Sequence, residues 1–201
     1  MKKLSYLFIS FTLLLTTTFV TMGQTQKISL KKDSGEITWK GKKVTGKKHH
    51  GKISIKEGML HVVDGELKDI NVTIDMNSID NQDIDSEKYR NKLEGHLKSD
   101  DFFHVKQYPE SHFKSTSIVK SSKENKYYVE GNLTIKGQTH PIEFSAFFNA
   151  EENNYKAEAE LTFDRSKYNV RYGSDSFFDN LGDDMIYNDI DLEINLQGAI
   201  N

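Results

Sequence analysis

The sequence predicts an all-β domain of antiparallel strands with one short helix. Apolar and polar residues alternate with period two over much of the chain, polar or glycine-bearing segments separate these stretches, and one segment repeats its apolar residues every fourth position instead. Strands with one apolar face must be covered by a second sheet or closed into a barrel. The alternation alone leaves both architectures open.

The N-terminus is typical of a secretory signal peptide. Two lysines precede an apolar stretch over residues 4–20 that has no acidic residue, and Thr21 and Gly23 then offer small side chains near a cleavage site. A membrane anchor, the alternative, needs about 20 apolar residues, and this stretch is shorter and rich in threonine. We expect residues 1–23 to be a signal peptide and residues 24–201 to be one domain of a periplasmic or secreted protein.

Composition excludes several classes of protein. The chain has no cysteine, so neither disulfide bonds nor a lipid-modified cysteine can stabilise or anchor it. Its net charge is -3, and loss of the signal-peptide lysines makes the charge more negative. Because nucleic-acid binding requires a net basic face, we expect no nucleic-acid partner.

Alternating stretches predict the strands in chain order. In residues 156–163, for example, alanine, leucine and phenylalanine share one face and charged or hydroxyl side chains share the other. The expected strands cover residues 70–76, 113–118, 127–135, 141–148, 156–163 and 190–197. Polar or glycine-bearing turns are expected at residues 56–58, 64–65, 123–125 and 151–154.

The segment from residue 86 to residue 98 has helical periodicity. A tyrosine and two leucines recur at every fourth position within it. Asp85 or Ser86 can cap its first turn, where Glu87 adds a favourable charge. We therefore expect a helix of about three turns.

Five motifs in a fixed order resemble one known family. The most informative, from His96 to Phe113 (HLKSDDFFHVKQYPESHF), joins the end of the helix, a paired-aromatic turn and the start of a strand. The others are residues 39–46 (WKGKKVTG), 74–79 (IDMNSI), 131–137 (GNLTIKG) followed by 140–142 (HPI), and 163–170 (FDRSKYNV). Together they resemble the YceI-like, polyisoprenoid-binding family over nearly the whole chain after residue 23.

The resemblance implies an extended antiparallel lipocalin-like β-barrel of about eight strands with one short α-helix. It thereby favours a barrel over a sandwich. A barrel of this size can hold one slender ligand, and the family is described as binding long isoprenoid chains inside it. The implied partner is an isoprenoid lipid or quinone, and no cofactor is expected.

The residues expected to line this interior share the inward face of three alternating stretches, where alanines stand among phenylalanines. Small residues opposite large ones can leave a tunnel, although the same residues can also fill a packed core. The expected lining is Leu133, Ile135, Phe144, Ala146, Phe148, Ala157, Ala159, Leu161 and Phe163.

Arg165 and Tyr168 follow the last of these strands and are predicted to lie at the barrel mouth. There a guanidinium group can bind phosphate oxygens, and a phenol can donate a hydrogen bond to a quinone carbonyl. The alternative for Arg165 is an ion pair with Asp164 or with another surface acid.

Two other segments leave alternatives open. The basic residues 42–52 can attract a pyrophosphate or an anionic membrane surface, or they form a solvated strand and loop, which we favour. Residues 172–184 form a long polar loop around Phe177 and Phe178. It is either a lid over the mouth or a crossover packed by those rings, and we expect the crossover.

Patterns for metal binding and catalysis are weak. His49 and His50 are adjacent, so on a strand they point to opposite faces, and the other histidines are scattered. No Gly-x-Ser-x-Gly motif is present. We therefore expect no metal site and no enzymatic activity.

The expected function is that of an exported lipid-binding protein. It would hold a long isoprenoid, either a polyprenyl phosphate or an isoprenoid quinone, in an apolar interior for transport or storage. One alternative is a ligand-free barrel that acts as an envelope stress or interaction protein, and another is a hydrolase that uses the barrel mouth. Homodimer formation and transient contact with a membrane surface are left open.

Overall fold

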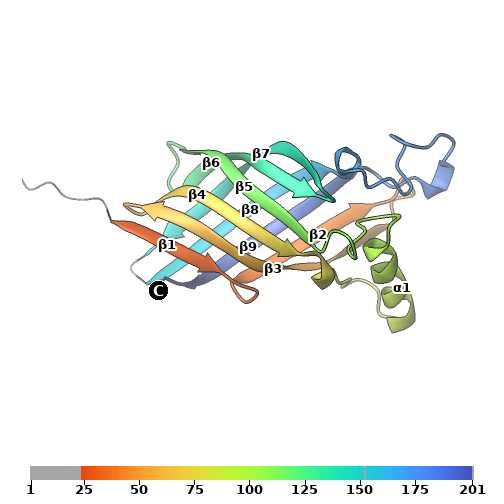
Figure 1. The fold of residues 1–201 in the computed structure, drawn as a ribbon, viewed down its shortest axis with the longest axis horizontal. Helices are drawn as coiled ribbons and strands as arrows, with labels where there is room; N and C mark the ends of the chain where they lie inside the picture. The colour runs from red at the N-terminus through yellow and green to blue at the C-terminus, as the bar shows by residue number, and fades with distance from the viewer. Residues whose placement is uncertain (1–23, 152, 201) are drawn as a thin grey trace, which may run out of the picture.

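The computed structural model describes residues 24–151 and 153–200, which form one sheet closed on itself (Figure 1). The strands are β1 (Thr25–Leu30), β2 (Gly35–Lys42), β3 (Lys48–Val63), β4 (Glu66–Asp75), β5 (Glu110–Lys120), β6 (Lys126–Ile135), β7 (Gln138–Ala150), β8 (Asn154–Asp164) and β9 (Asp189–Ala199). The helical elements are α1 (Glu87–Lys98) and three 3₁₀ turns, η1 (Met76–Ser78), η2 (Arg165–Tyr168) and η3 (Gly182–Asp184). The expected signal peptide lies outside the described residues.

The strands pair antiparallel in the order β1-β3-β2-β9-β8-β7-β6-β5-β4, and the pairing of β3 with β4 closes the ring. The two pairings that join the halves of the chain are β2 with β9, where Gly35 faces Leu196, and β4 with β5, where Val72 faces Phe113. Eight strands, β2 to β9, form the closed barrel, and β1 lies beside β3. The predicted antiparallel barrel with one helix is confirmed.

β3 is the longest strand and pairs with two strands along one side. Its first half pairs with β2, and its second half pairs with β1. On its other side, the register with β4 shifts between Ile55 and Glu57, which is a β-bulge. The prediction of a turn at residues 56–58 is therefore wrong. The glycine and charged residues of this segment lie at a bulge within a continuous strand.

The turn after β3 shows why the remaining turn predictions succeed. Asp64 and Gly65 both have positive φ, 53° and 75°, as a tight hairpin turn of two residues requires. Asn125, between β5 and β6, likewise has φ 56°. Asparagine, aspartate and glycine tolerate this conformation best, so turn composition located these reversals.

Helix α1 packs on the barrel mainly through its C-terminal half. Ser86 is its N-cap residue and Glu87 lies in the first turn, as predicted, although no side chain caps the helix. Leu97 is buried and Leu93 is half-buried, whereas Tyr89 is 62% exposed. Within the described ranges, no helix combines the length and apolar character needed to cross a bilayer.

The barrel has two different ends (Figure 1). At the turn end lie the short β3–β4, β5–β6 and β7–β8 connections, and at the capped end lie α1 and the segment 165–188 between β8 and β9. Each end contains its own cluster of buried residues. Tyr127, Phe148 and Tyr155 belong to the turn-end cluster, and Phe102, Phe163 and Tyr168 belong to the capped-end cluster.

Candidate functional site

Strand β8 shows how the barrel interior is filled along its length. Its inward residues near the two ends, Tyr155 and Phe163, are only 4% and 6% exposed. Between them, the inward residues Ala157, Ala159 and Leu161 are only partly buried. The strand is therefore packed at its ends and less completely covered in the middle.

Neighbouring strands repeat this pattern in register. On β7, Phe148 is buried near the turn end, whereas Phe144 in the middle is half-buried. Ala146 faces Ala159 across the β7–β8 pair, and Ala159 faces Ile194 across the β8–β9 pair. Two alanines thus meet on the inner surface, Ala146 within the turn-end cluster and Ala159 packed against it, where larger side chains would fill more of the space.

All nine expected lining residues lie on the inward face, but the two clusters divide them. Phe148 and Ala146 are buried in the turn-end cluster, with Phe144, Ala157 and Ala159 packed against it. Leu133, Ile135 and Phe163 are buried in the capped-end cluster, with Leu161 packed against it. Whether these residues contact a ligand stays a prediction.

Sequence analysis missed the residues that join the two clusters. Ile53, Ile74, Phe113 and Leu192 are half-buried and pack against both clusters, so they line the middle of the interior. Three of them, Ile74, Phe113 and Leu192, lie in stretches predicted as strands, 70–76, 113–118 and 190–197. That alternation could have identified them, but only strand closure shows that β3, β4, β5 and β9 face the same space.

The ring of Phe113 lies against Gly131 of β6, two residues along from Leu133, its partner in the strand pairing. A Cβ atom on Gly131 would lie 2.4 Å from Cζ of Phe113 and 2.6 Å from the carbonyl oxygen of Lys114. The ring centroid of Phe113 is also 5.4 Å from that of Phe144. Gly131 therefore provides the space that this pair of aromatic rings occupies, and the GNLTIKG motif contains a packing residue.

Arg165 is fully buried, which differs from both expectations for it. Its Nε, Nη1 and Nη2 atoms donate hydrogen bonds to the carbonyl oxygens of Tyr187, Val170 and Ile186 at 3.2, 2.9 and 3.1 Å. Its guanidinium carbon lies 5.4 Å from the ring centroid of Phe102. Burial lowers the pKa of Arg165 to about 10.

The predicted position of Arg165 at an open mouth is thus corrected. Because all three nitrogens already donate to backbone carbonyls, the side chain holds the segment 165–188 against the barrel end. The expected alternative, an ion pair with Asp164, is also not observed. Asp164 instead accepts hydrogen bonds from the backbone N–H and the hydroxyl of Ser166, which fixes the start of η2.

Tyr168 carries a buried hydroxyl that has no hydrogen-bond partner among the described residues. The side chain is 1% exposed and packs edge-on against His140, at 5.2 Å, and against Phe163, at 5.7 Å. Burial, with a smaller contribution from Asp164, raises the pKa of Tyr168 to about 12. The group is therefore a neutral donor, and a buried donor without an acceptor costs free energy.

Lys136 closes the capped end from the β6–β7 turn. Its Nζ donates to the carbonyl oxygens of Asp100, Phe102 and Asn169 at 3.3, 2.7 and 3.1 Å. Partial burial, aided by the nearby charge of Arg171, lowers the pKa of Lys136. One ammonium group therefore connects the β6–β7 turn, the α1–β5 loop and the residues after η2.

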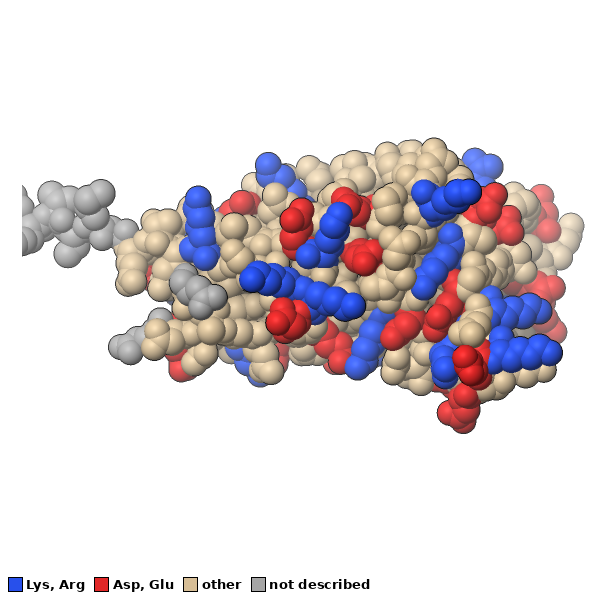
Figure 2. Space-filling view, turned by 60° about the horizontal axis from the view of Figure 1, so that its bottom comes forward, with Lys and Arg blue, Asp and Glu red and all other residues tan. Residues whose placement is uncertain are grey.

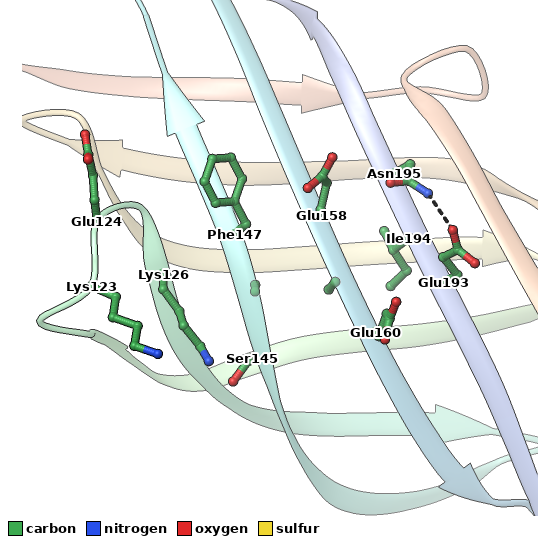
Figure 3. A pocket seen from close by; sticks show the side chains of 12 residues that line it. Lys123, Glu124, Lys126, Ser145, Phe147, Glu158, Glu160, Glu193, Ile194 and Asn195 are labelled. Atoms are coloured by element: carbon green, nitrogen blue, oxygen red, sulfur yellow. Dashed lines mark hydrogen bonds between the residues drawn. The ribbon is translucent and has the colours of Figure 1, made fainter.

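Two pockets open on the outside of the protein. One, of about 470 Å³, lies beside Lys136 and is bordered by Tyr108, Arg171 and Phe178. The other, of about 690 Å³, lies over β7, β8 and β9, where Ser145, Phe147, Glu158, Glu160 and Asn195 border it (Figure 3). These strand residues alternate with the inward ones, so the second pocket lies mainly on the outer surface of the barrel. The inward residues Ala146, Ala159 and Ile194 also border it.

The basic segment 42–52 forms the end of β2, its hairpin turn and the start of β3. Nδ1 of His49 donates a hydrogen bond to one carboxylate oxygen of Asp83 at 2.8 Å, and the other oxygen accepts one from the backbone N–H of His50 at 2.8 Å. Burial raises the pKa of Asp83, but its hydrogen bonds and the nearby His49 lower the pKa overall. Over the described ranges, no group of three or more His, Asp or Glu residues is arranged to hold a metal ion.

The loop expected as a packed crossover differs from that expectation. Phe177 and Phe178, predicted to pack it, are 38% and 49% exposed. Arg171 lies over the Phe177 ring, 5.0 Å from its centroid. The loop is held instead by Arg165 and by Asn188, whose side chain donates to Asp175 and Ser176.

Comparison with known proteins identifies the relatives of this chain. A family model described as the YceI-like domain matches residues 28–198. A UPF0312 protein of Pectobacterium carotovorum is 32% identical over 107 residues, 50% of this chain and 51% of that protein. The protein YceI of Salmonella arizonae is 36% identical over 77 residues, 38% and 36% of the two chains. The match thus spans about half or less of the length of these curated relatives.

Solved structures share the barrel at low sequence identity. A polyisoprenoid binding domain from Saccharophagus degradans has a TM-score of 0.65 and 14% identity, covering 89% of this chain and all of that one. BcnA of Burkholderia cenocepacia has a TM-score of 0.58 and 20% identity, covering 82% of this chain and 96% of that one. At these identities the similarity concerns the fold.

Proposed function

Because the chain belongs to the YceI-like domain family, we propose that it binds one long isoprenoid lipid inside its barrel. The structural neighbour from Saccharophagus degradans is named a polyisoprenoid binding domain, and its shared fold supports the proposal. The observation that carries it is the incompletely covered middle of the inner face, between two well-packed ends.

The chemistry of that middle region suits a hydrocarbon chain. Its inward side chains are alanine, leucine, isoleucine and phenylalanine, which offer no hydrogen bonds to water. Each buried methylene contributes about 0.8 kcal/mol to binding, and a flexible prenyl chain can follow a narrow interior. The half-buried residues Ile53, Ile74 and Leu192 would gain the contacts that the barrel itself does not supply.

The head group of the lipid would be placed at the capped end, near Tyr168. Its buried hydroxyl is a neutral donor without an acceptor, and a quinone carbonyl or a prenyl hydroxyl would supply one. Two cations of this end, Arg165 and Lys136, already donate to backbone carbonyls, whereas Lys47, Lys48 and Arg171 lie exposed on its outer surface. This arrangement favours an isoprenoid quinone over a polyprenyl phosphate.

We propose that the protein carries or stores this lipid and does not transform it. The shifted pKa values of Arg165, Lys136 and Tyr168 arise chiefly from burial, and the two cations hold backbone segments together. Export through the expected signal peptide would place the barrel in the envelope. There an apolar tail needs a container to pass through water.

Tryptophan fluorescence offers a direct test of the interior site. Trp39 is the single tryptophan of the chain and packs against the capped-end cluster, so a quinone bound there would quench its emission. Titration with a short-chain isoprenoid quinone should give saturable one-to-one quenching. Ala159→Phe should weaken binding by about tenfold or more, because the added ring fills the interior.

Ser145→Phe is the matched control for this titration. It adds the same ring to the outer face of the neighbouring strand, where Ser145 faces Glu160. The control should bind the quinone as the unmodified protein does. Equal affinity of all three proteins, or quenching that never saturates, would rule out the interior site.

A further inference from the structure

Exposed apolar side chains gather at the capped end of the barrel. Within the described ranges, nine large apolar residues are exposed, and six of them lie on α1, on the β2–β3 hairpin or on the segment between η2 and β9. We call these six residues the rim patch: Val44, Tyr89, Tyr172, Phe177, Phe178 and Tyr187. The other three, Met59, Val119 and Tyr128, lie on strands of the barrel wall.

Backbone and ring contacts join most of the rim patch into one surface. The hairpin is tied to the loop by an isolated bridge between Lys43 and Ile186, and by the hydrogen bond from the N–H of Val44 to Met185, at 3.0 Å. On the other side, Tyr172 packs edge-on against His96 of α1 with 4.4 Å between ring centroids. The exposure of these side chains therefore belongs to a connected part of the fold.

Cationic side chains accompany the exposed rings. Nζ of Lys42 lies 5.5 Å from the ring centroid of Tyr187, and Arg171 lies over Phe177. Lys47 and Lys48 are exposed at the hairpin turn beside Val44. Figure 2 shows basic side chains projecting at the capped end among acidic ones.

Some acidic side chains of this surface form ion pairs or hydrogen bonds, and others are exposed to solvent. Asp184 pairs with Lys43 at 3.3 Å, and Asp175 accepts a hydrogen bond from Asn188 at 2.9 Å. Asp179 and Asp183 are exposed. The hairpin side is therefore basic, and the loop side carries the aromatic rings.

We propose that the capped end docks on a lipid bilayer through the rim patch. Aromatic rings with a polar edge favour the headgroup layer of a bilayer, and lysine and arginine can keep their charges in water while their stems lie along it. The lysines of the hairpin complement anionic headgroups. Docking in this orientation brings the end that holds Tyr168 and Lys136 next to the membrane, the source of isoprenoid lipids.

This proposal depends on surface residues alone and not on the ligand inside the barrel. A second copy of the chain is another occupant that an apolar surface can accept. The lysines flanking Val44 and the cations over two of the rings complement an anionic lipid surface, which is the occupant that we propose.

Vesicle co-sedimentation of the purified exported protein tests the docking. The vesicles are phosphatidylcholine alone and a three-to-one mixture of phosphatidylcholine with phosphatidylglycerol. The double variant Phe177→Ser, Phe178→Ser should bind the mixed vesicles about tenfold more weakly, because it removes two rings from the headgroup layer. Binding should also be stronger to the mixed vesicles than to phosphatidylcholine alone.

The chain provides a matched control on the barrel wall. Tyr128 is 53% exposed, and Nζ of Lys126 lies 5.5 Å from its ring centroid. Lys42 lies at the same distance from the ring of Tyr187 in the rim patch. Tyr128→Ser should bind vesicles as the unmodified protein does. Lys47→Ser with Lys48→Ser should lose affinity for mixed vesicles and not for phosphatidylcholine.

Three outcomes would overturn the proposal. The first is that the protein binds neither kind of vesicle. The second is that the Phe177/Phe178 and Tyr128 variants lose binding equally. The third is that the protein binds no vesicles but forms a dimer in sedimentation velocity, and that the Phe177/Phe178 variant abolishes this dimer. The last outcome would assign the rim patch to a second copy of the chain. None of them affects the quinone titration, so failure of docking and failure of interior binding are distinguishable.

Discussion

Arg165 and Tyr168 lie in the same 3₁₀ turn and are both buried, but their polar groups differ in how they are satisfied. Arg165 donates to three carbonyl oxygens that come from residues 170, 186 and 187. The Tyr168 hydroxyl has no hydrogen-bond partner within the part of the chain that the structure describes. The turn therefore contains one residue whose hydrogen bonds hold backbone segments together and one whose hydroxyl is proposed to bind the ligand.

Replacement of Tyr168 by phenylalanine should change stability and binding in opposite directions. Because the hydroxyl is buried and unpaired, Tyr168→Phe should raise the free energy of unfolding of the ligand-free protein by about 1 kcal/mol. The same variant should bind a short-chain isoprenoid quinone about fivefold to tenfold more weakly, since one hydrogen bond is lost. Urea denaturation and Trp39 quenching measure the two effects, and a large loss of stability would contradict this account.

The raised pKa of Tyr168 also predicts a pH dependence. In the unfolded chain the phenol ionises near its ordinary pKa of 10.0, whereas in the folded protein it ionises near 12. Between these values the unfolded chain releases a proton that the folded protein retains, so stability falls as the pH rises from 10 to 12. Denaturation curves across this range should fall less steeply for Tyr168→Phe than for the unmodified protein.

For these single residues, the sequence indicated that Arg165 and Tyr168 belong together but did not predict their burial or their hydrogen-bond partners. The FDRSKYNV motif drew attention to Arg165 and Tyr168 together. Burial of Arg165 depends on carbonyl oxygens about 20 residues away in the chain, beyond a loop that has no periodic pattern. No local feature of the sequence specifies which backbone atoms return to meet the guanidinium group.

Among the connecting elements, the β6–β7 turn has the most direct effect on the capped end. Lys136 has φ 51° in this turn, and its ammonium group reaches the α1–β5 loop and the residues after η2. The next residue, Gly137, also has positive φ, 73°. The turn conformation thus directs a long side chain over the barrel end.

Removal of this ammonium group should loosen the two segments that it joins. Lys136→Met leaves three carbonyl oxygens without their donor, so the free energy of unfolding should fall by about 1–3 kcal/mol. Amide hydrogen exchange should quicken in residues 99–108 and 169–178. Lys106→Met, at an exposed position in the same loop, is the control and should change neither quantity.

Strand elements were the most predictable part of the fold, because a half-buried strand shows itself by alternation. Strands β4 to β9 were all anticipated, mostly with boundaries a few residues too short, although the stretch 70–76 extended one residue beyond the end of β4. The bulge in β3 was mistaken for a turn, since Gly58 and its charged neighbours have the composition of a turn. The packing of the loop 172–184 could not be predicted, because Phe177 lies against Arg171 and both Phe177 and Phe178 are exposed instead of entering a core.

In the whole molecule, closure of the barrel makes the inward faces of the separate strands line one interior. It depends on pairings between distant segments, such as Val72 with Phe113 and Gly35 with Leu196. Alternation cannot reveal such partners, so a sandwich remained open until the family motifs were considered. The division of the interior into two packed ends and a less covered middle appears only when all strands are in register.

Two separable properties are proposed for this architecture. The middle of the interior is proposed to hold the lipid tail, and the capped end is proposed to face the membrane. A protein that carries lipid needs both properties, whereas a barrel that acts only through its surface needs the second alone.

Native mass spectrometry of the exported protein, purified from a bacterial envelope, tests the central claim most directly. Organic extraction of the same sample identifies whatever is released. The account predicts one polyprenyl-tailed molecule per barrel, with a neutral quinone head group, and its absence from Ala159→Phe but not from Ser145→Phe. Protein that emerges without a bound lipid, and that remains without one when isoprenoid quinones are added, would contradict the claim.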